Sequence, residues 1–151
     1  MSVNRTFATQ RQSIVKALVT KLKEIDGNSP FLTNLNNNVS PRLKFWDEVD
    51  DFPAVHVNAG SETREYQTGG RKDRFLTITL RCYVNEEDAV DALDKLLEDV
   101  EVVVEANSRL SYTDKTGGAR TTLQSTVISI DTDEGVLEPL GVGEMLIEVR
   151  Y

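Results

Sequence analysis

The sequence predicts an α+β fold in which a mostly antiparallel or mixed β-sheet has two main helices packed on one face. Three observations predict it. Residues 121–151 read as two strands around a loop rich in Gly, Pro and Asp, and the second strand alternates to its end. Residues 62–84 read as a β-hairpin. Apolar residues recur at helical spacing near the N-terminus and over residues 89–104.

The first predicted element is a helix near the N-terminus. Asn4 or Thr6 can serve as its N-cap, and Gly27 ends it. Its apolar positions recur at helical spacing and are Phe7, Ile14, Leu18, Leu22 and Ile25. We therefore expect this helix to pack one face on the sheet.

A long connection follows the first helix. Residues 28–42 are rich in Asn, Ser and Pro, which form side-chain turns, so a loop is predicted. A short strand is predicted over residues 43–46. An acidic connector comes next, made by Asp47, Glu48, Asp50 and Asp51. Pro53 cannot donate to a strand ladder and suits the start of a strand, which predicts a strand over residues 54–59.

A hairpin occupies the middle of the chain. Residues 62–67 are predicted to turn through residues 68–73 into a long strand over residues 75–84. The face of that strand expected to pack on the helices holds Leu76, Ile78, Leu80, Cys82 and Val84. Burial of each large apolar side chain stabilises the fold by about 1.5 to 3 kcal/mol.

The second helix has a strong start signal. Asn85 is the predicted N-cap, and the carboxylates that follow it meet the positive end of the helix dipole. Asn107 is predicted to end the helix. The inward stripe is expected to hold Ala89, Leu93, Leu96, Leu97, Val100 and Val104.

The C-terminal part combines a polar segment and a regular strand. Residues 113–121 contain Gly117 and Gly118 among polar residues, so we expect poor order there. In the last strand, one face is expected to hold Met145, Ile147, Val149 and Tyr151. We predict one core between sheet and helices that includes Leu80, Leu93, Leu97, Ile147 and Val149.

Length and composition predict one domain over residues 1–151. Hydrophobic residues make up 39% of the chain and charged residues 28%, values typical of soluble globular proteins. No apolar run approaches the roughly 20 residues that span a bilayer, and the N-terminus has no secretory signal. We therefore expect a protein made in a cytoplasm with no membrane partner.

The net charge of −8 is concentrated in one segment. Residues 86–105 hold nine carboxylates and one lysine, while the remaining 16 acidic and 16 basic residues cancel. The exposed carboxylates expected on this helix form a candidate acidic surface: Asp91, Asp94, Glu98, Glu101 and Glu105. Such a face repels nucleic-acid phosphates, which disfavours tight DNA binding. A solvated face that keeps the protein soluble also explains it.

The search for catalytic and metal-binding motifs is negative. His56 is expected on the face opposite Val55 and Val57, as a hydrogen-bonded or solvated side chain. Cys82 is predicted to be a buried small hydrophobe. Residues 131–135 resemble the start of a calcium loop but lack the bidentate glutamate at position twelve. We predict no catalytic residue, no cofactor site and no metal site.

Several segments together resemble a known family. They are FPAVHVNAG with nearby Glu62, the strand that ends in CYV, the acidic helix, and ISIDTDEGVLEPLGVGEMLIEVRY at the end. In pattern and order these segments resemble the tail terminator (tail completion) proteins of long-tailed bacteriophages, over most of the chain. None of them is a catalytic signature.

The resemblance implies a structural protein of the virion, assembled in the host cytoplasm. Its subunits would close into a hexameric ring on the last ring of the tail tube, stop tube polymerisation and offer a surface to the head connector or stopper protein. DNA would pass through the lumen without specific binding. The exposed hairpin is the first candidate for the subunit interface, through Glu62, Arg64, Glu65, Arg71, Lys72 and Arg74.

Two other functions stay open at this point. One is another head-to-tail joining ring, an adaptor or stopper, which would share ring closure but not tube capping. The other is a small cytoplasmic ligand-binding domain or enzyme that uses the acidic connector and His56. Six-fold rings in solution would separate the first class from the second.

Overall fold

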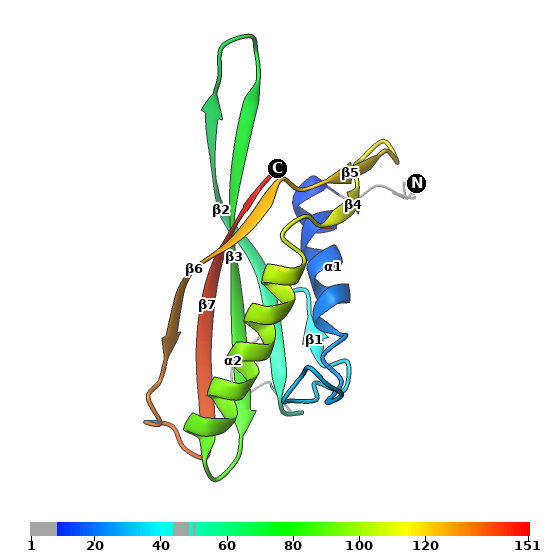
Figure 1. Ribbon diagram of the computed structural model, residues 1–151. Helices are drawn as coiled ribbons and strands as arrows, with labels where there is room; N and C mark the ends of the chain where they lie inside the picture. The colour runs from blue at the N-terminus through cyan, green and yellow to red at the C-terminus, as the bar shows by residue number, and fades with distance from the viewer. Residues whose placement is uncertain (1–8, 44–48, 50) are drawn as a thin grey trace, which may run out of the picture.

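The computed structural model describes residues 9–43, 49 and 51–151 (Figure 1). The elements in chain order are α1 Gln10–Leu22, β1 Val39–Ser40, β2 Ala54–Tyr66, β3 Lys72–Asn85, α2 Ala89–Ala106, β4 Ser111–Thr113, β5 Ala119–Thr121, β6 Gln124–Thr132 and β7 Leu140–Arg150.

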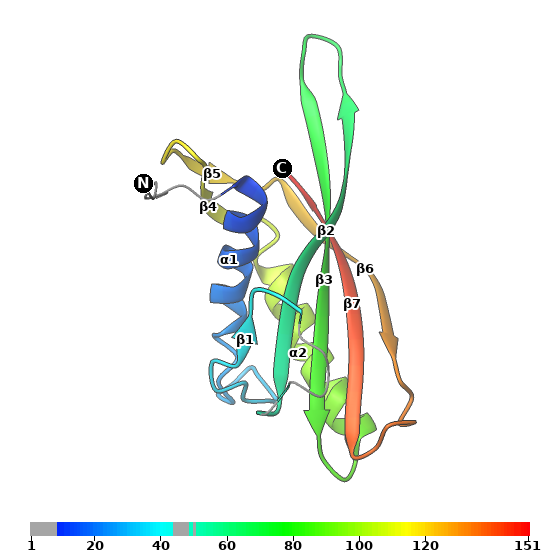
Figure 2. The same ribbon diagram turned by 180° about the vertical axis from the view of Figure 1, so that it is seen from behind.

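The main sheet is mixed and has the strand order β1-β2-β3-β7-β6. β1 runs parallel to β2, and the other neighbouring pairs are antiparallel. Both helices pack on one face of this sheet (Figure 2). The predicted α+β fold with two helices on one face is therefore confirmed.

Apolar residues at alternate positions of β3 and β7 explain the packing at the centre of the sheet. In β3 the predicted inward set is buried, with Leu76, Ile78 and Leu80 fully covered. In β7, Met145, Ile147 and Val149 are covered in the same way and lie opposite Leu80, Ile78 and Leu76. The predicted core is confirmed, because Leu80, Leu93, Leu97, Ile147 and Val149 all belong to one buried cluster.

The fit of α2 against the sheet depends on two glycines in β7. A Cβ at Gly141 would lie 2.7 Å from Val84 Cγ2 in β3 and 3.3 Å from Ala89 Cβ at the start of α2, and one at Gly143 would lie 3.2 Å from Leu93 Cδ1. Real side chains do not tolerate the first of these contacts. These glycines therefore allow the helix to approach the strand closely.

The helix caps differ from the predictions. α1 begins at Gln10, where the Thr9 side chain accepts a hydrogen bond from the backbone N–H of Gln12. The predicted caps Asn4 and Thr6, like Phe7, lie outside the described residues. α2 is capped by Asp88, not Asn85, because β3 extends to Asn85 and the carboxylate of Asp88 accepts from Asp91 N–H. The predicted end at Asn107 is confirmed.

The two strands predicted over residues 54–59 and 62–67 are one strand, β2. The register with β3 shifts between Ala59 and Glu62, so a bulge joins the segments without a break. The turn of the hairpin is correspondingly shorter than predicted, at residues 67–71. The outer part of the β2–β3 hairpin projects well beyond the rest of the molecule (Figures 1 and 2). We call residues 61–75 the hairpin arm.

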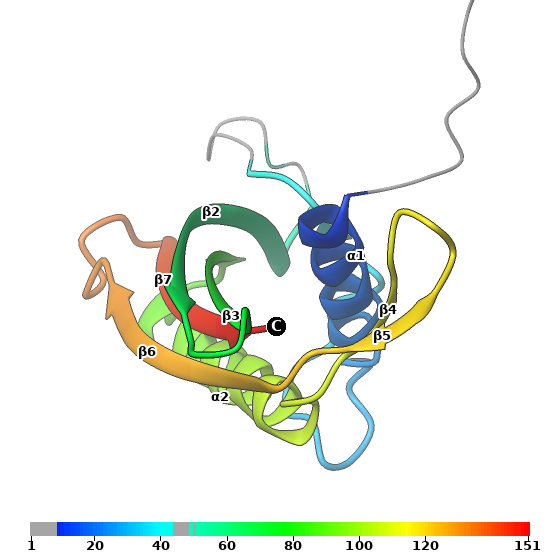
Figure 3. The ribbon, with the colours of Figure 1, turned by 90° about the horizontal axis from the view of Figure 1, so that it is seen from above.

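The expectation of poor order over residues 113–121 is wrong. β4 and β5 form a small hairpin beside α1 (Figure 3). Its turn is held by the Asp114 carboxylate, which accepts hydrogen bonds from the backbone N–H groups of Thr116 and Gly118. The Thr116 hydroxyl and Arg120 also bind this carboxylate. Hydrogen bonds between the Asp114 side chain and the backbone thus hold a turn that has no apolar side chain to anchor it.

The long connection after α1 is mainly turns, as predicted, but it contains β1 and is fixed to α2. The buried Asp99 carboxylate accepts hydrogen bonds from the backbone N–H groups of Leu32 and Thr33. Of the strand predicted over residues 43–46, Leu43 is not in a strand and the others lie outside the described residues. The acidic connector falls largely outside them too, at Asp47, Glu48 and Asp50.

Candidate assembly surfaces

The hairpin arm carries the six predicted interface residues. Arg64 lies directly opposite Arg74, and Glu65 lies opposite Asp73. Strand alternation places Glu62, Arg64, Lys72 and Arg74 on one face and Glu65 on the other, while Arg71 lies in the turn. Two like charges directly opposite each other disfavour strand pairing. The sequence did not reveal this pairing, because the bulge before Glu62 sets the register.

Tyr151 joins the base of the arm to the sheet. Its backbone N–H donates to the carbonyl of Arg74 at 3.0 Å, and Arg74 N–H donates back at 3.2 Å. The Tyr151 hydroxyl donates to Oε1 of Glu62, and Arg64 Nε donates to Oε2 of the same carboxylate at 2.9 Å. The Arg74 guanidinium lies 5.5 Å from the centre of the Tyr151 ring. We call Glu62, Arg64, Arg74 and Tyr151 the arm-base cluster.

The pKa values of this cluster follow from these contacts. Burial and the hydrogen bond to Glu62 raise the pKa of Tyr151 to about 12. Burial acts to raise the pKa of Glu62 as well, but the hydrogen bonds from Tyr151 and Arg64 outweigh it and the pKa is lowered. Glu62 is therefore an anion and Tyr151 a neutral donor at neutral pH.

Two clefts of about 400 and 360 Å³ flank the arm-base cluster. Of the side chains lining them in the described part of the chain, that of Asp73 is the one carboxylate. The cations that line them come from α1, the arm and the β4–β5 hairpin, and are Arg11, Arg64, Arg71, Lys72, Arg74, Lys115 and Arg120. We call this set the basic end. Sequence reasoning missed Arg11, Lys115 and Arg120, because they are brought here from segments far apart in the chain.

Some charges of the basic end are already paired within the chain. Arg71 lies 3.5 Å from Asp73, and Arg120 lies 3.0 Å from Asp114. Hydrogen bonds from Thr116, Gly118 and Arg120 hold the pKa of Asp114 well below its usual range. Lys72 and Arg74 instead lie over the rings of Tyr66 and Tyr151. Such cation–π contacts are weak at exposed sites, at about 0.5 to 1 kcal/mol.

The predicted acidic surface lies along the outer face of α2. Asp91, Asp94, Glu98 and Glu105 are exposed and Glu101 is half-buried. Lys95 pairs with Asp91 at 2.8 Å, which leaves the surface strongly negative. Asp99 belongs to the same acidic segment but is 2% exposed and serves the fold. The structure thus brings the predicted acidic residues onto one face, away from the basic arm.

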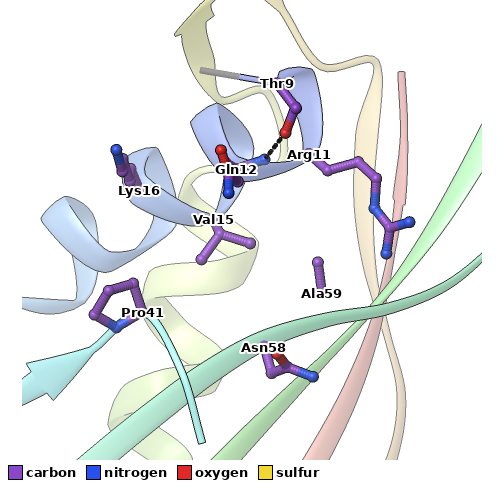
Figure 4. Close-up of a pocket in the computed structure, with 8 residues that line it drawn as sticks. All are labelled: Thr9, Arg11, Gln12, Val15, Lys16, Pro41, Asn58 and Ala59. Carbon is purple, nitrogen blue, oxygen red and sulfur yellow. Dashed lines mark hydrogen bonds between the residues drawn. The ribbon is translucent and has the colours of Figure 1, made fainter. Parts of the chain in front are cut away.

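A third cleft, of about 480 Å³, lies between α1 and β2 (Figure 4). Arg11, Val15 and Lys16 line it from α1, and Asn58 and Ala59 line it from β2. Figure 4 shows the Arg11 side chain extending from the helix toward the strand. The Arg11 guanidinium donates a hydrogen bond to the carbonyl of Gly60 at the bulge.

Three residues whose side chains could take part in catalysis or metal binding contribute to the fold instead. His56 is 2% exposed, and its ring packs 5.1 Å from that of Tyr83. Burial raises the pKa of Cys82 to about 12, so its thiol is unreactive. Asp133, in the segment that resembled a calcium loop, accepts hydrogen bonds from the N–H groups of Gly135 and Leu137.

The described residues hold neither a metal-binding cluster nor a membrane-spanning helix. Among residues 9–43, 49 and 51–151, no three His, Cys, Asp or Glu side chains lie together in a way that could hold a metal ion. Within the same part of the chain, neither helix has the length and apolar character needed to span a membrane.

The chain is similar to known proteins in both sequence and fold. A chain in the solved virion of a native gene transfer agent particle shares the fold, with a TM-score of 0.62 and 7% identity over 91% of this chain and 93% of that one. The tail tube terminator protein p142 of Escherichia phage T5 is 35% identical over 149 residues, which cover 93% of this chain and 92% of p142. The family model described as bacteriophage tail tube terminator protein matches residues 8–151. The chain therefore belongs to the bacteriophage tail tube terminator family.

Proposed function

We propose that the protein forms a hexameric ring that caps the phage tail tube, stops its polymerisation and provides the surface to which the head connector attaches. The observation that carries the proposal is the family match over residues 8–151. Membership of this family makes the chain a structural protein of the virion tail and not an enzyme.

The hairpin arm is the proposed contact between neighbouring subunits. It projects from the molecule, so a neighbour can reach both of its faces. Arg64, Arg71, Lys72 and Arg74 supply positive charge to meet the acidic surface on α2 of the adjacent copy. Opposite charges on unlike surfaces favour a head-to-tail interface, which closes into a ring when the rotation per subunit fits.

The acidic surface also suits a protein through whose ring DNA passes. Within a ring the exposed carboxylates of α2 repeat around one axis. Their field repels phosphates, so DNA moves through without specific binding. Repulsion of DNA and contact with the neighbouring arm both use the exposed carboxylates of α2. The two roles are compatible only if the neighbour leaves part of this acidic surface uncovered.

The test combines assembly with tube length. Purified protein is examined by light scattering and negative-stain microscopy, and is then added to polymerising tube subunits of the same phage. We expect six-fold rings and shorter tubes with capped ends. Tubes of unchanged length would contradict tube capping. Binding to the head connector without binding to tube ends would instead favour an adaptor or stopper ring.

A further inference from the structure

The main sheet has two free edges of different character. In the strand order β1-β2-β3-β7-β6, β6 lies at one edge and pairs only with β7 among the described strands. At the other edge, β1 covers β2 only at Val55 and His56. Beyond His56 the outer side of β2 has no strand partner in the described part of the chain. Free edges carry unpaired backbone donors and acceptors.

The β6 edge carries few of the features that protect a free edge in a monomer. Its sequence QSTVISIDT is rich in β-branched residues and contains neither Lys nor Pro. Ile128 and Ile130 are 53% and 41% exposed, and Ile128 is the extra residue of a bulge. Monomeric proteins usually guard such a strand with charge or proline. An unguarded edge of this kind is suited to pair with another strand.

The free edge of β2 offers a place where such a strand could pair. β1 ends at Ser40, and Pro41 then lines the cleft of about 480 Å³ beside Asn58 and Ala59. The cleft therefore continues along β2 from the point where β1 stops, with α1 as its far wall (Figure 4). An added strand in this position would bind the backbone groups of β2 that β1 leaves without a strand partner.

Charge favours a second copy of this chain as the occupant. Among the described residues, the charged ones that line the cleft are Arg11 and Lys16, both positive. The one charged residue in β6 is Asp131, and Asp133 and Glu134 follow it in the turn. The negative end of β6 thus complements the positive wall beside β2.

We infer that β6 of one subunit pairs with the free edge of β2, along the α1 cleft and hairpin arm, of the next subunit. The inference rests on the proposed ring and specifies how it closes. Because each copy has one edge of each kind on opposite sides of the sheet, the contact is head-to-tail and repeats around the ring. The sheets of all subunits then form one continuous sheet.

The main test places charge on the β6 edge. In the double variant Ile128→Lys and Ile130→Lys, two exposed side chains change, so the fold should persist. The matched control changes Val136→Lys and Leu137→Lys, which are 82% and 48% exposed in the following turn. Light scattering and negative-stain microscopy should show that the β6 variant loses its rings or needs at least about tenfold more protein to form them. The control should form rings like the parent.

The possible outcomes distinguish failure of the β6–β2 pairing from failure of the ring proposal. A parent protein that forms no rings contradicts the proposed function and the pairing with it. Rings in the parent and equally in the β6 variant overturn the pairing alone. A β6 variant with an altered circular dichroism spectrum calls for the second test, which does not depend on that variant.

The second test uses single cysteines. One set of proteins carries a cysteine at Thr126, Ile128 or Ile130 of β6, and another at Ser61, Thr63 or Glu65 of β2. Under mild oxidation we expect disulfide-linked dimers only when the two sets are mixed, since Cys82 is buried. A protein with the matching pair in one chain should give a ladder that ends at the hexamer. Crosslinks between β6 and β6 alone would overturn the head-to-tail pairing.

Discussion

Asp99 shows how one carboxylate in an acidic helix can serve the interior. Its neighbours in sequence form an exposed negative face, but its side chain is 2% exposed and accepts hydrogen bonds from the loop before β1. The Thr33 hydroxyl donates to it as well. A buried carboxylate persists only when its oxygens are bonded in this way. Asp99 thereby fixes the position of a loop that has few apolar contacts of its own.

Replacement of Asp99 by alanine should lower the free energy of unfolding by about 2 to 3 kcal/mol, because the N–H groups of Leu32 and Thr33 lose their acceptor. The measurement is the urea midpoint with an unchanged slope. The control Glu98→Ala changes an exposed carboxylate in the same turn and should stay within about 0.5 kcal/mol of the parent. Equal effects of the two changes would contradict the role assigned to Asp99.

Asp114 predicts a pH dependence of the β4–β5 hairpin. Its folded-state pKa lies below the ordinary value of 3.8, so the ionised side chain stabilises the turn above that pH. This contribution is lost as the pH falls through the lowered pKa. Carboxyl NMR shifts should show Asp114 titrating well below free aspartate. In Thr116→Ala, which removes the largest cause of the shift, the midpoint should rise; an unchanged midpoint would refute this explanation.

At the scale of elements, the contact between α2 and β7 is the most demanding fit in the fold. Leu93 and Leu97 of α2 lie over Gly143 of β7, while Val84 of β3 and Ala89 at the start of α2 leave no room at Gly141 for even a methyl group. Protein interiors are close-packed, so a small added volume forces neighbours to move. The acidic surface is thus held at a fixed distance from the sheet.

Gly141→Ala should therefore destabilise the protein by about 1 to 3 kcal/mol through overpacking against Val84 and Ala89. The matched control is Gly60→Ala, whose Cβ would lie 3.6 Å from the Thr77 carbonyl, an ordinary contact. Thermal unfolding of the two variants provides the comparison. If Gly60→Ala proved the more harmful change, the close approach of α2 would not be what requires glycine in β7.

The elements also show what the sequence can and cannot predict. Alternation in β3 and β7 and the apolar stripe of α2 predicted the core, because burial on one face imposes a fixed period. The bulge in β2 and the β4–β5 hairpin escaped prediction, since they depend on a register shift and on the side chain of Asp114. At the candidate site, arm residues were named from sequence. Arg11 and Lys115 were not, because only the tertiary fold brings them there.

The whole molecule is divided by charge along its length. The basic end surrounds the arm. At the opposite end of the sheet (Figure 1), the turns before α2 and before β7 carry Glu86, Glu87, Asp88, Asp133, Glu134 and Glu138. Such a separation orients an approaching partner before any contact forms. Assembly should therefore depend on salt.

Arg71→Glu together with Lys72→Glu should weaken ring formation and make it less sensitive to salt, while the melting temperature of the monomer changes little. The Arg71 side chain is 65% exposed, so its pairing with Asp73 contributes little stability. Lys23→Glu with Arg109→Glu, both exposed and outside residues 61–75, is the control. Ring formation equal to that of the parent at every salt concentration would show that the arm is not the subunit contact.

The shape of the arm has a consequence for how assembly can be followed. Neither α1 nor α2 underlies it, and residues 63–71 are exposed, so its hydrogen bonds close over very little buried surface. Local opening there costs far less free energy than unfolding of the core, and its amide protons in a free subunit should exchange rapidly with deuterium. A neighbour that covers the arm would slow this exchange without any change in the core. Deuterium exchange of the arm, measured by mass spectrometry, therefore reports when the ring closes.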